Sequence, residues 1–258
     1  MKKRHLIYVA CLLVAMGACS ATSKERTKIT PDAWGKYNVG TILFEDKAPE
    51  TKGSDIYHRI IPDAESYIKA QAREVLATLY HSPEDSIPTV NKIHYTLEDI
   101  EGVSAKGGGN GDVTIFYSTR HIEKSFAAND TAKLFFETRG VLLHELTHAY
   151  QLEPQGVGSY GTNRVFWAFI EGMADAVRVA NGGFDGPNAR PKGGNYMDGY
   201  RTAGYFFVWL RDNKDPEFLR KFNRSTLEVI PWSFDGAIKH ILGNEYNIDE
   251  LWHEYQVA

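Results

Sequence analysis

The segment GVLLHELTHAYQ, residues 140–151, most constrains what this chain can fold into. Its apolar residues recur every three or four positions, which predicts a helix with one face in the core. Two histidines, His144 and His148, stand four residues apart within it. Because residues at this spacing differ by about 40° in direction around a helix, both imidazoles point to the same side. The segment therefore predicts a helix that presents two histidines to one shared point.

This histidine spacing is typical of a zinc-binding helix, in which HExxH supplies two metal ligands. Glu145 lies about 100° around the helix from His144. It is thus placed to act on a water molecule that the metal activates, without becoming a ligand itself. The alternative interpretation is an amphipathic helix whose histidines only border the core or face water.

A catalytic zinc site needs a third protein ligand and one open position. The segment FIEGMAD, residues 169–175, offers two carboxylates one helical turn apart, Glu171 and Asp175. They stand among apolar residues, and a buried acid needs a partner such as a metal with its histidine ligands. We expect Asp175 to accept the free ring N–H of a histidine. Gly172 removes a side chain where two helices must approach closely. A solvent-facing acidic stripe is the alternative.

HELTHAYQ followed by IEGMADAVR resembles the basic secretory protein family of plants and bacteria, a family of zinc peptidases. The chain also shares the HExxH…E pattern of thermolysin-like zincins. Further segments correspond to the family's layout: TIFYSTR at 114–120, MDGY at 197–200, the aromatic stretch at 202–210 and DELWHEY at 249–255. The resemblance covers about residues 40–258, and the zinc motifs are its specific part.

The resemblance implies a role for each residue of the two motifs. His144 and His148 would be ligands of one Zn²⁺ per chain, and Glu145 the general base that hydrolyses a peptide bond. Glu171 matches the third ligand of thermolysin-like zincins, and Asp175 matches their aspartate behind the ligands. Asp175 in place of Glu171 as the third ligand is the alternative.

Tyr200, in the DGY turn, is the candidate second donor to the oxyanion, with Arg201 behind it. The alternative for Tyr200 is a tyrosine that only packs. The family's label "basic" does not transfer, because the chain has 33 acidic residues against 29 Lys and Arg.

The coarse pattern predicts an α+β fold, with a small zincin-like mixed sheet and helices followed by a mainly helical C-terminal half. Strands are predicted at residues 41–44, 89–97 and 112–118. Helices are predicted at residues 62–80, 131–151, 163–180, 198–211, 216–222, 233–242 and 248–255. The stretch KGGGNG, residues 106–111, reads as a flexible hairpin connection. The strand at 112–118 is either an edge strand that aligns an extended substrate or an interior strand.

The N-terminus predicts export. Lys2, Lys3 and Arg4 precede a mostly apolar run too short to span a bilayer, which is typical of a secretory signal at residues 1–18. The run ends in MGAC and resembles a bacterial lipobox, so Cys19 would carry a lipid anchor. Simple cleavage near Ala21 is the alternative. A polar tether at 19–38 would then lead to a metallopeptidase-like domain at 39–258.

Composition excludes several classes of protein. The two cysteines, Cys11 and Cys19, both lie at the extreme N-terminus, so a disulfide scaffold is excluded. Loss of residues 1–18 leaves 26 basic residues, three fewer than in the full chain, against 33 acidic ones. No basic block is present, so we expect no nucleic-acid partner and membrane contact only through the anchor.

We therefore expect an exported, lipid-anchored zinc endopeptidase whose partner is a protein or peptide substrate. A non-catalytic surface protein that retains the metal site and binds through its cleft is the alternative from another class. A third possibility is a metallohydrolase that cleaves a non-peptide amide. Metal content and turnover separate the three.

Overall fold

A computed structural model describes residues 33–184 and 188–258 of the chain. The signal peptide, Cys19 and most of the tether lie outside these residues and stay predictions. The predicted tether included residues 33–38, yet the described unit begins at Ala33, and Trp34 is buried with its ring edge against Tyr37. Across the described residues, no helix combines the length and the apolar character needed to cross a membrane.

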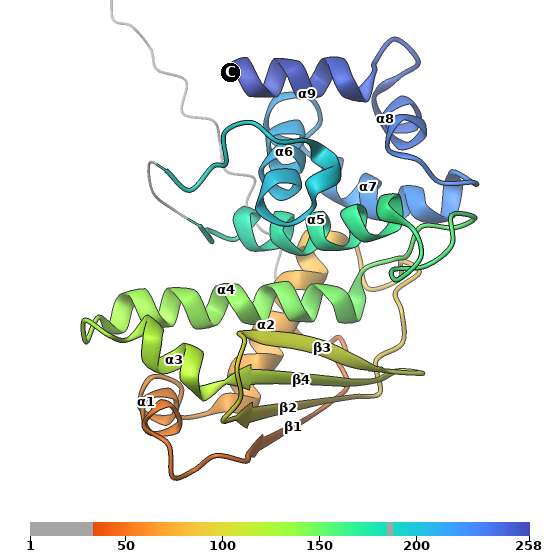
Figure 1. The fold of residues 1–258 in the computed structure, drawn as a ribbon. Helices are drawn as coiled ribbons and strands as arrows, with labels where there is room; N and C mark the ends of the chain where they lie inside the picture. The colour runs from red at the N-terminus through yellow and green to blue at the C-terminus, as the bar shows by residue number, and fades with distance from the viewer. Residues whose placement is uncertain (1–32, 185–187) are drawn as a thin grey trace, which may run out of the picture. The chain divides into compact units, whose positions relative to one another are not determined.

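A mixed sheet forms the N-terminal half of the domain (Figure 1). Its strands are β1 (Thr41–Asp46), β2 (Lys92–Glu98), β3 (Ser104–Gly109) and β4 (Asp112–Ser118), in the order β1-β2-β4-β3. β1, β2 and β4 run parallel, whereas β3 is antiparallel to β4. Helices dominate the rest of the described chain, so the predicted α+β class is confirmed.

One expectation about this sheet is wrong, and of the two alternatives left open for residues 112–118 the interior strand is the one observed. Residues 106–109 are not a flexible connection but belong to β3, and only Asn110 and Gly111, with φ of 54° and 83°, make the hairpin turn. Because β3 pairs with β4 on its outer side, β4 is interior and the edge is β3. Glycine has a low strand propensity, so the strand arises from pairing with β4 rather than from a local preference.

The helices are α1 (Lys52–Ile60), α2 (Ala64–Leu79), α3 (Thr119–Ser125), α4 (Thr131–Tyr150), α5 (Arg164–Ala180), α6 (Tyr200–Asn213), α7 (Phe218–Glu228), α8 (Phe234–Leu242) and α9 (Ile248–Val257), with a 3₁₀ turn at Tyr196–Asp198. The short helices α1 and α3 were not predicted, since a helix of two turns carries little periodic signal. Side-chain caps from Thr51 and Ser118 begin them.

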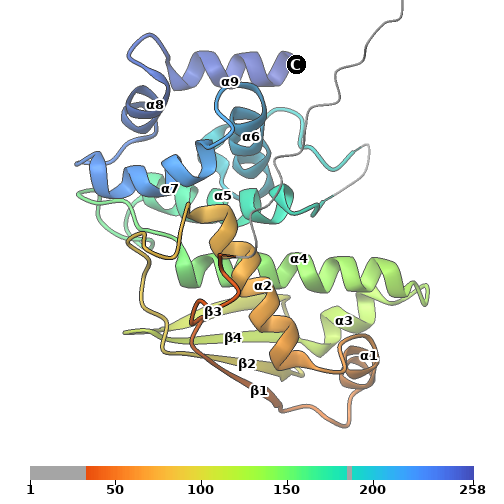
Figure 2. The same ribbon diagram turned by 180° about the vertical axis from the view of Figure 1, so that it is seen from behind.

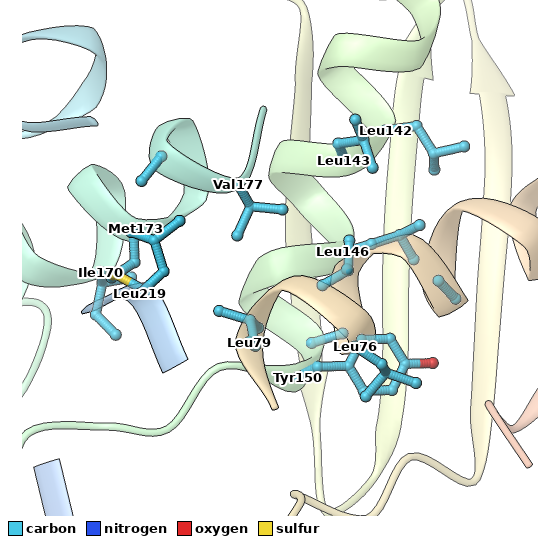
Figure 3. Close-up of a cluster of buried hydrophobic side chains, with 14 of the residues drawn as sticks. Leu76, Leu79, Leu142, Leu143, Leu146, Tyr150, Ile170, Met173, Val177 and Leu219 are labelled. Atoms are coloured by element: carbon cyan, nitrogen blue, oxygen red, sulfur yellow. The ribbon is translucent and has the colours of Figure 1, made fainter. Parts of the chain in front are cut away.

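The core joins the sheet side of the domain to the helical side through α4. In Figure 2, which shows the molecule from behind, α2 passes across α4. The sheet lies below α4 in this view, and α5 lies above it. Figure 3 shows the apolar side chains that meet there: Leu76 and Leu79 of α2, Leu142, Leu143, Leu146 and Tyr150 of α4, Ile170, Met173 and Val177 of α5, and Leu219 of α7. Burial on both sides holds α4 in place along its length.

Helices α5 and α6 approach closely because each presents a glycine to the other. A Cβ at Gly172 would lie 2.7 Å from the Phe207 ring and 2.8 Å from the Cβ of Ala203. A Cβ at Gly204 would lie 2.8 Å from the backbone nitrogen of Ala176, with the backbone of Asp175 almost as near. The expected close helix approach at Gly172 is therefore present, and Gly204 is its counterpart.

Replacing Gly204 by alanine should destabilise the domain. Alanine gains up to ~1 kcal/mol of helix propensity, but its Cβ meets backbone that cannot rotate away, and overpacking costs about 1–3 kcal/mol. We expect a net loss of about 1–2 kcal/mol in the free energy of unfolding, measured by urea denaturation. In Gly161→Ala the added Cβ meets nothing within 4 Å, so that control should change stability by less than ~0.5 kcal/mol. Equal stability of the two variants would contradict the packing argument.

Candidate metal centre

Three side chains from two helices converge on one point. His144 and His148 come from α4 and Glu171 from α5. The two Nε2 atoms lie 3.1 Å apart, and Oε2 of Glu171 lies 3.3 Å from Nε2 of His144 and 3.7 Å from Nε2 of His148. Tetrahedral ligands at 2.0–2.1 Å from a zinc ion stand about 3.3 Å from one another. The three atoms thus form a possible metal-binding triad.

The antiparallel register of α4 and α5 brings these residues together. Going along α4, the partners on α5 run backwards: Glu137 meets Arg178, His144 meets Asp175 and His148 meets Glu171. Steps of three, four and seven residues keep all of these side chains on the facing sides of the two helices. The two motifs therefore form one site although 22 residues separate His148 from Glu171 in the sequence.

The carboxylate of Glu171 shows that the residues fit a cation. The side chain is buried, with 4% of its surface exposed. Oε1 accepts a hydrogen bond from the hydroxyl of Tyr160 at 2.5 Å, whereas Oε2 is fully buried and has no hydrogen-bond partner among the described residues. A buried carboxylate oxygen without a partner is costly. Because Oε2 faces both Nε2 atoms, a metal ion between them would satisfy all three.

Asp175 holds His144 from the side opposite the triad. Its Oδ1 lies 2.7 Å from Nδ1 of His144. A carboxylate accepts a hydrogen bond from Nδ1–H. The lone pair of the ring is then on Nε2, the atom that faces Glu171. The carboxylate of Asp175 is thus committed to the far side of the ring, and that geometry favours Glu171 over Asp175 as the third ligand.

Gln151 contacts Nδ1 of His148 as Asp175 contacts Nδ1 of His144. Its side-chain amide lies 2.8 Å from Nδ1 of His148, and its Oε1 is a buried atom without a partner in the described chain. The two ends of an amide are nearly identical in shape. If the amide oxygen of Gln151 is turned towards the ring, it accepts a hydrogen bond from Nδ1–H of His148. The lone pair of His148 is then on Nε2. Gln151 follows His148 by about one helical turn, and it is not among the site residues predicted from the sequence.

The charges of the metal-free site are divided between the two rings. Burial disfavours a charged imidazole, but the nearby carboxylates of Asp175 and Glu171 outweigh it and raise the pKa of His144 to about 10. Burial and the neighbouring charge of His144 lower the pKa of His148 to about 3. At neutral pH the metal-free chain therefore keeps a proton on His144, and a metal ion must displace it.

Glu145 lies beside the triad and faces the edge strand. Its side chain is buried, and burial raises the pKa of its carboxyl, against hydrogen bonds from the Ser104 side chain and the Lys106 backbone. Both of these residues belong to β3. The residue that the sequence assigned as general base thus stands between the metal-binding atoms and the free edge of the sheet.

Two tyrosines complete the surroundings of the triad. The ring of Tyr200 stacks over His144 with centroids 6.0 Å apart, and its edge meets Trp167. Tyr200 has a φ of 42°, in the left-handed region, directly after Gly199, where a Cβ would lie 2.8 Å from the Trp167 ring. Such strain is retained where the surroundings fix the backbone. Tyr160, on the loop before α5, was not anticipated, and only its place in a Gly-rich stretch next to the motif hints at it.

The site opens into a cleft of about 740 Å³. Ser104, Ala105 and Lys106 of β3 line one wall together with the preceding Val103, and α4 and α5 supply the floor with the triad. Tyr160, Tyr200 and Arg201 line it on the other side. All sequence-predicted site residues of the described chain meet at this cleft.

A sequence model of a family described as "peptidase of plants and bacteria", named BSP, matches residues 40–255. The chain belongs to the BSP family. This confirms the resemblance seen in the sequence and supports a peptidase role for the chain. No curated protein and no solved structure matches the chain significantly.

Substitution of the triad should separate ligands from their supports. We expect Glu171→Ala to weaken zinc binding by more than about 100-fold, because it removes a ligand atom. Asp175→Asn should weaken it by about 10- to 100-fold, since the histidine loses the acceptor that orients it. Zinc affinity is measured by competition with a chelator of known affinity. Glu153→Gln, another carboxylate of the cleft wall, is the control and should bind as the wild type does. A larger loss in Asp175→Asn than in Glu171→Ala would move the third ligand to Asp175.

Proposed function

We propose that this member of the BSP family is a zinc-dependent endopeptidase. The observation that carries the proposal is the unpartnered Oε2 of Glu171, which shares one point with Nε2 of His144 and Nε2 of His148 in the cleft. Two imidazoles and one carboxylate are a donor set that suits zinc and leaves a fourth position open. That open position faces a cleft large enough to admit a peptide segment.

A zinc ion held by these three residues would supply a water molecule of lowered pKa and a Lewis acid for the carbonyl oxygen. Glu145 then acts as general base: it takes the proton of the attacking water and later gives it to the leaving amine. Burial, which raises the pKa of its carboxyl, suits a group that must both accept and return a proton. Ser104 and Lys106 of β3 line the same cleft as Glu145.

The edge strand β3 is the element that would align the substrate. It pairs with β4 on one side only among the described residues, and its residues 104–106 line the cleft. An extended peptide can add to such an edge by main-chain hydrogen bonds. Antiparallel addition is the commoner arrangement in sheets and slightly more stable per residue. We therefore propose that the substrate runs antiparallel to β3, with the scissile bond above the triad.

Tyr200 remains the proposed donor to the oxyanion. Its ring lies over His144 at the cleft wall, and it is half exposed, so its hydroxyl is free to meet a substrate. Burial and nearby carboxylates raise its pKa, so the hydroxyl keeps its proton at neutral pH and can donate it in a hydrogen bond. Tyr160, in contrast, already donates to Glu171.

Replacing the base should remove activity while the metal site is kept. We expect Glu145→Gln to bind zinc as the wild type does and to cleave a casein-type protein substrate at least ~100-fold more slowly, because no group then takes the proton from water. Zinc content and proteolysis are measured on the same preparation of residues 20–258. Cleavage at the wild-type rate by Glu145→Gln would refute the mechanism. Zinc binding without any turnover by the wild type would favour the non-catalytic binding protein.

The two tyrosines should have different defects. Tyr200→Phe is expected to lower kcat by about 10²- to 10³-fold with unchanged zinc affinity, the usual effect of losing one oxyanion donor. Tyr160→Phe is expected to lower zinc affinity by about tenfold or more, because Glu171 loses the hydrogen bond that orients it. Each variant is the control of the other. The reverse pattern of defects would assign the oxyanion role to Tyr160.

A further inference from the structure

The cleft has a cationic end that the proposed mechanism does not use. Arg178 of α5 and Arg201 of α6 both line the cleft, together with Val141 and Phe184. The guanidinium carbon of Arg178 lies 3.8 Å from the centroid of the Phe184 ring, and that of Arg201 lies 5.2 Å from the same centroid. Two guanidinium groups thus share one aromatic ring at one end of the cleft.

Arg178 is a buried arginine whose donors are only partly used. Only 6% of its surface is exposed, and its Nη2 donates to Glu137 at 2.7 Å. Its Nε is fully buried without a hydrogen-bond partner in the described chain. The guanidinium fits there because Gly140 has no side chain, since a Cβ at Gly140 would lie 2.4 Å from that Nε. Glu137 balances the charge of Arg178 and binds its Nη2, and Nε faces Gly140, so the donor that Arg178 offers in a fixed position is Nη1.

Arg201 supplies the uncompensated charge. It is exposed, and its guanidinium has no hydrogen bond or ion pair with any residue of the described ranges. Arginine is the side chain best suited to hold a carboxylate.

The direction of the substrate places this cationic end after the scissile bond. Ser104 at the start of β3 pairs with Tyr117, whose hydroxyl lies 3.2 Å from Thr138 in the first half of α4. The start of β3 and the start of α4 therefore lie on the same side. Val141 and Arg178 lie on that side too, since α5 is antiparallel to α4. A peptide antiparallel to β3 has its carboxyl end there.

We infer that Arg178 and Arg201 form a subsite for a carboxylate of the substrate on the C-terminal side of the scissile bond. This inference rests on the proposed peptidase function and defines its substrate class. The carboxylate belongs either to an Asp or Glu side chain next to the scissile bond or to the free C-terminus of a peptide. Arg178 orients it through Nη1, and Arg201 provides the attracting charge.

The test uses the zinc-loaded protein and acetylated, amidated peptides that differ only in the residue after the scissile bond, with Asp, Asn, Glu, Gln, Leu or Lys there. Mass spectrometry locates the cleaved bond. We expect kcat/KM for Asp or Glu to exceed that for Asn or Gln by about tenfold or more, with Lys lowest. A second series with Leu at that position carries a free carboxylate or an amide at the C-terminus. Preference for the free carboxylate would identify the terminus as the source.

The variants separate the arginines from other causes. Arg201→Gln should reduce the preference for the carboxylate to within about threefold, and Arg201→Glu should favour Lys. Arg211→Gln, a partly buried arginine of the same helix outside the cleft, should keep the wild-type preference. Arg178→Lys keeps the charge but loses the planar guanidinium that places Nη1, so it should weaken the preference.

Two results would overturn the inference: equal cleavage of the Asp, Asn and Leu peptides with no effect of a free C-terminus, or a preference that persists in Arg201→Gln and Arg178→Lys. Calorimetry with zinc-loaded Glu145→Gln measures binding of the same peptides without turnover. If the wild type cleaves no peptide, the proposed function fails, and this binding comparison still decides the subsite. Stronger binding of Asp over Asn peptides, lost in Arg201→Gln, supports it, and equal binding overturns it.

Discussion

The antiparallel packing of α5 against α4 is the constraint on which the site depends. Neither helix alone holds a metal: α4 offers two imidazoles, and α5 offers the carboxylate that completes the triad. Their apolar sides are buried against α2 and α7, so the register between the helices is set by core packing. The glycine contacts between α5 and α6 then fix α5 from its other side. The chemistry is thus positioned by burial of apolar surface rather than by the polar groups themselves.

The polar groups instead fix orientation. Asp175 and Gln151 each occupy the ring nitrogen that faces away from the triad, and Tyr160 occupies one oxygen of Glu171. Each contact leaves one atom directed at the same point. Buried polar atoms are normally paired, so this shared pattern of one occupied and one free atom is informative about a missing cation.

The sequence predicted most of the site but only part of the sheet. HExxH and the acids at positions 171 and 175 obey helical spacing, so their faces follow from periodicity alone. Strand β3 escaped because SAKGGG has little local strand preference and is ordered by pairing with β4. Tyr160 was missed because its role depends on where a loop returns in space, which no local pattern records. Gln151 lies only three residues after His148, a local position, and was not considered.

The placement of β3 gives the two faces of the cleft different parts in the proposed binding of a peptide substrate. Main-chain hydrogen bonds along a glycine-rich edge do not distinguish the side chains of the substrate. They fix only its direction and its distance from Glu145. Selectivity must then come from the floor and the opposite wall. There the chain, which is acidic overall, gathers Arg178 and Arg201 against one ring. A local positive charge within an acidic protein attracts a carboxylate at short range while the surface as a whole repels one, so binding of an acidic substrate depends on fit within the cleft.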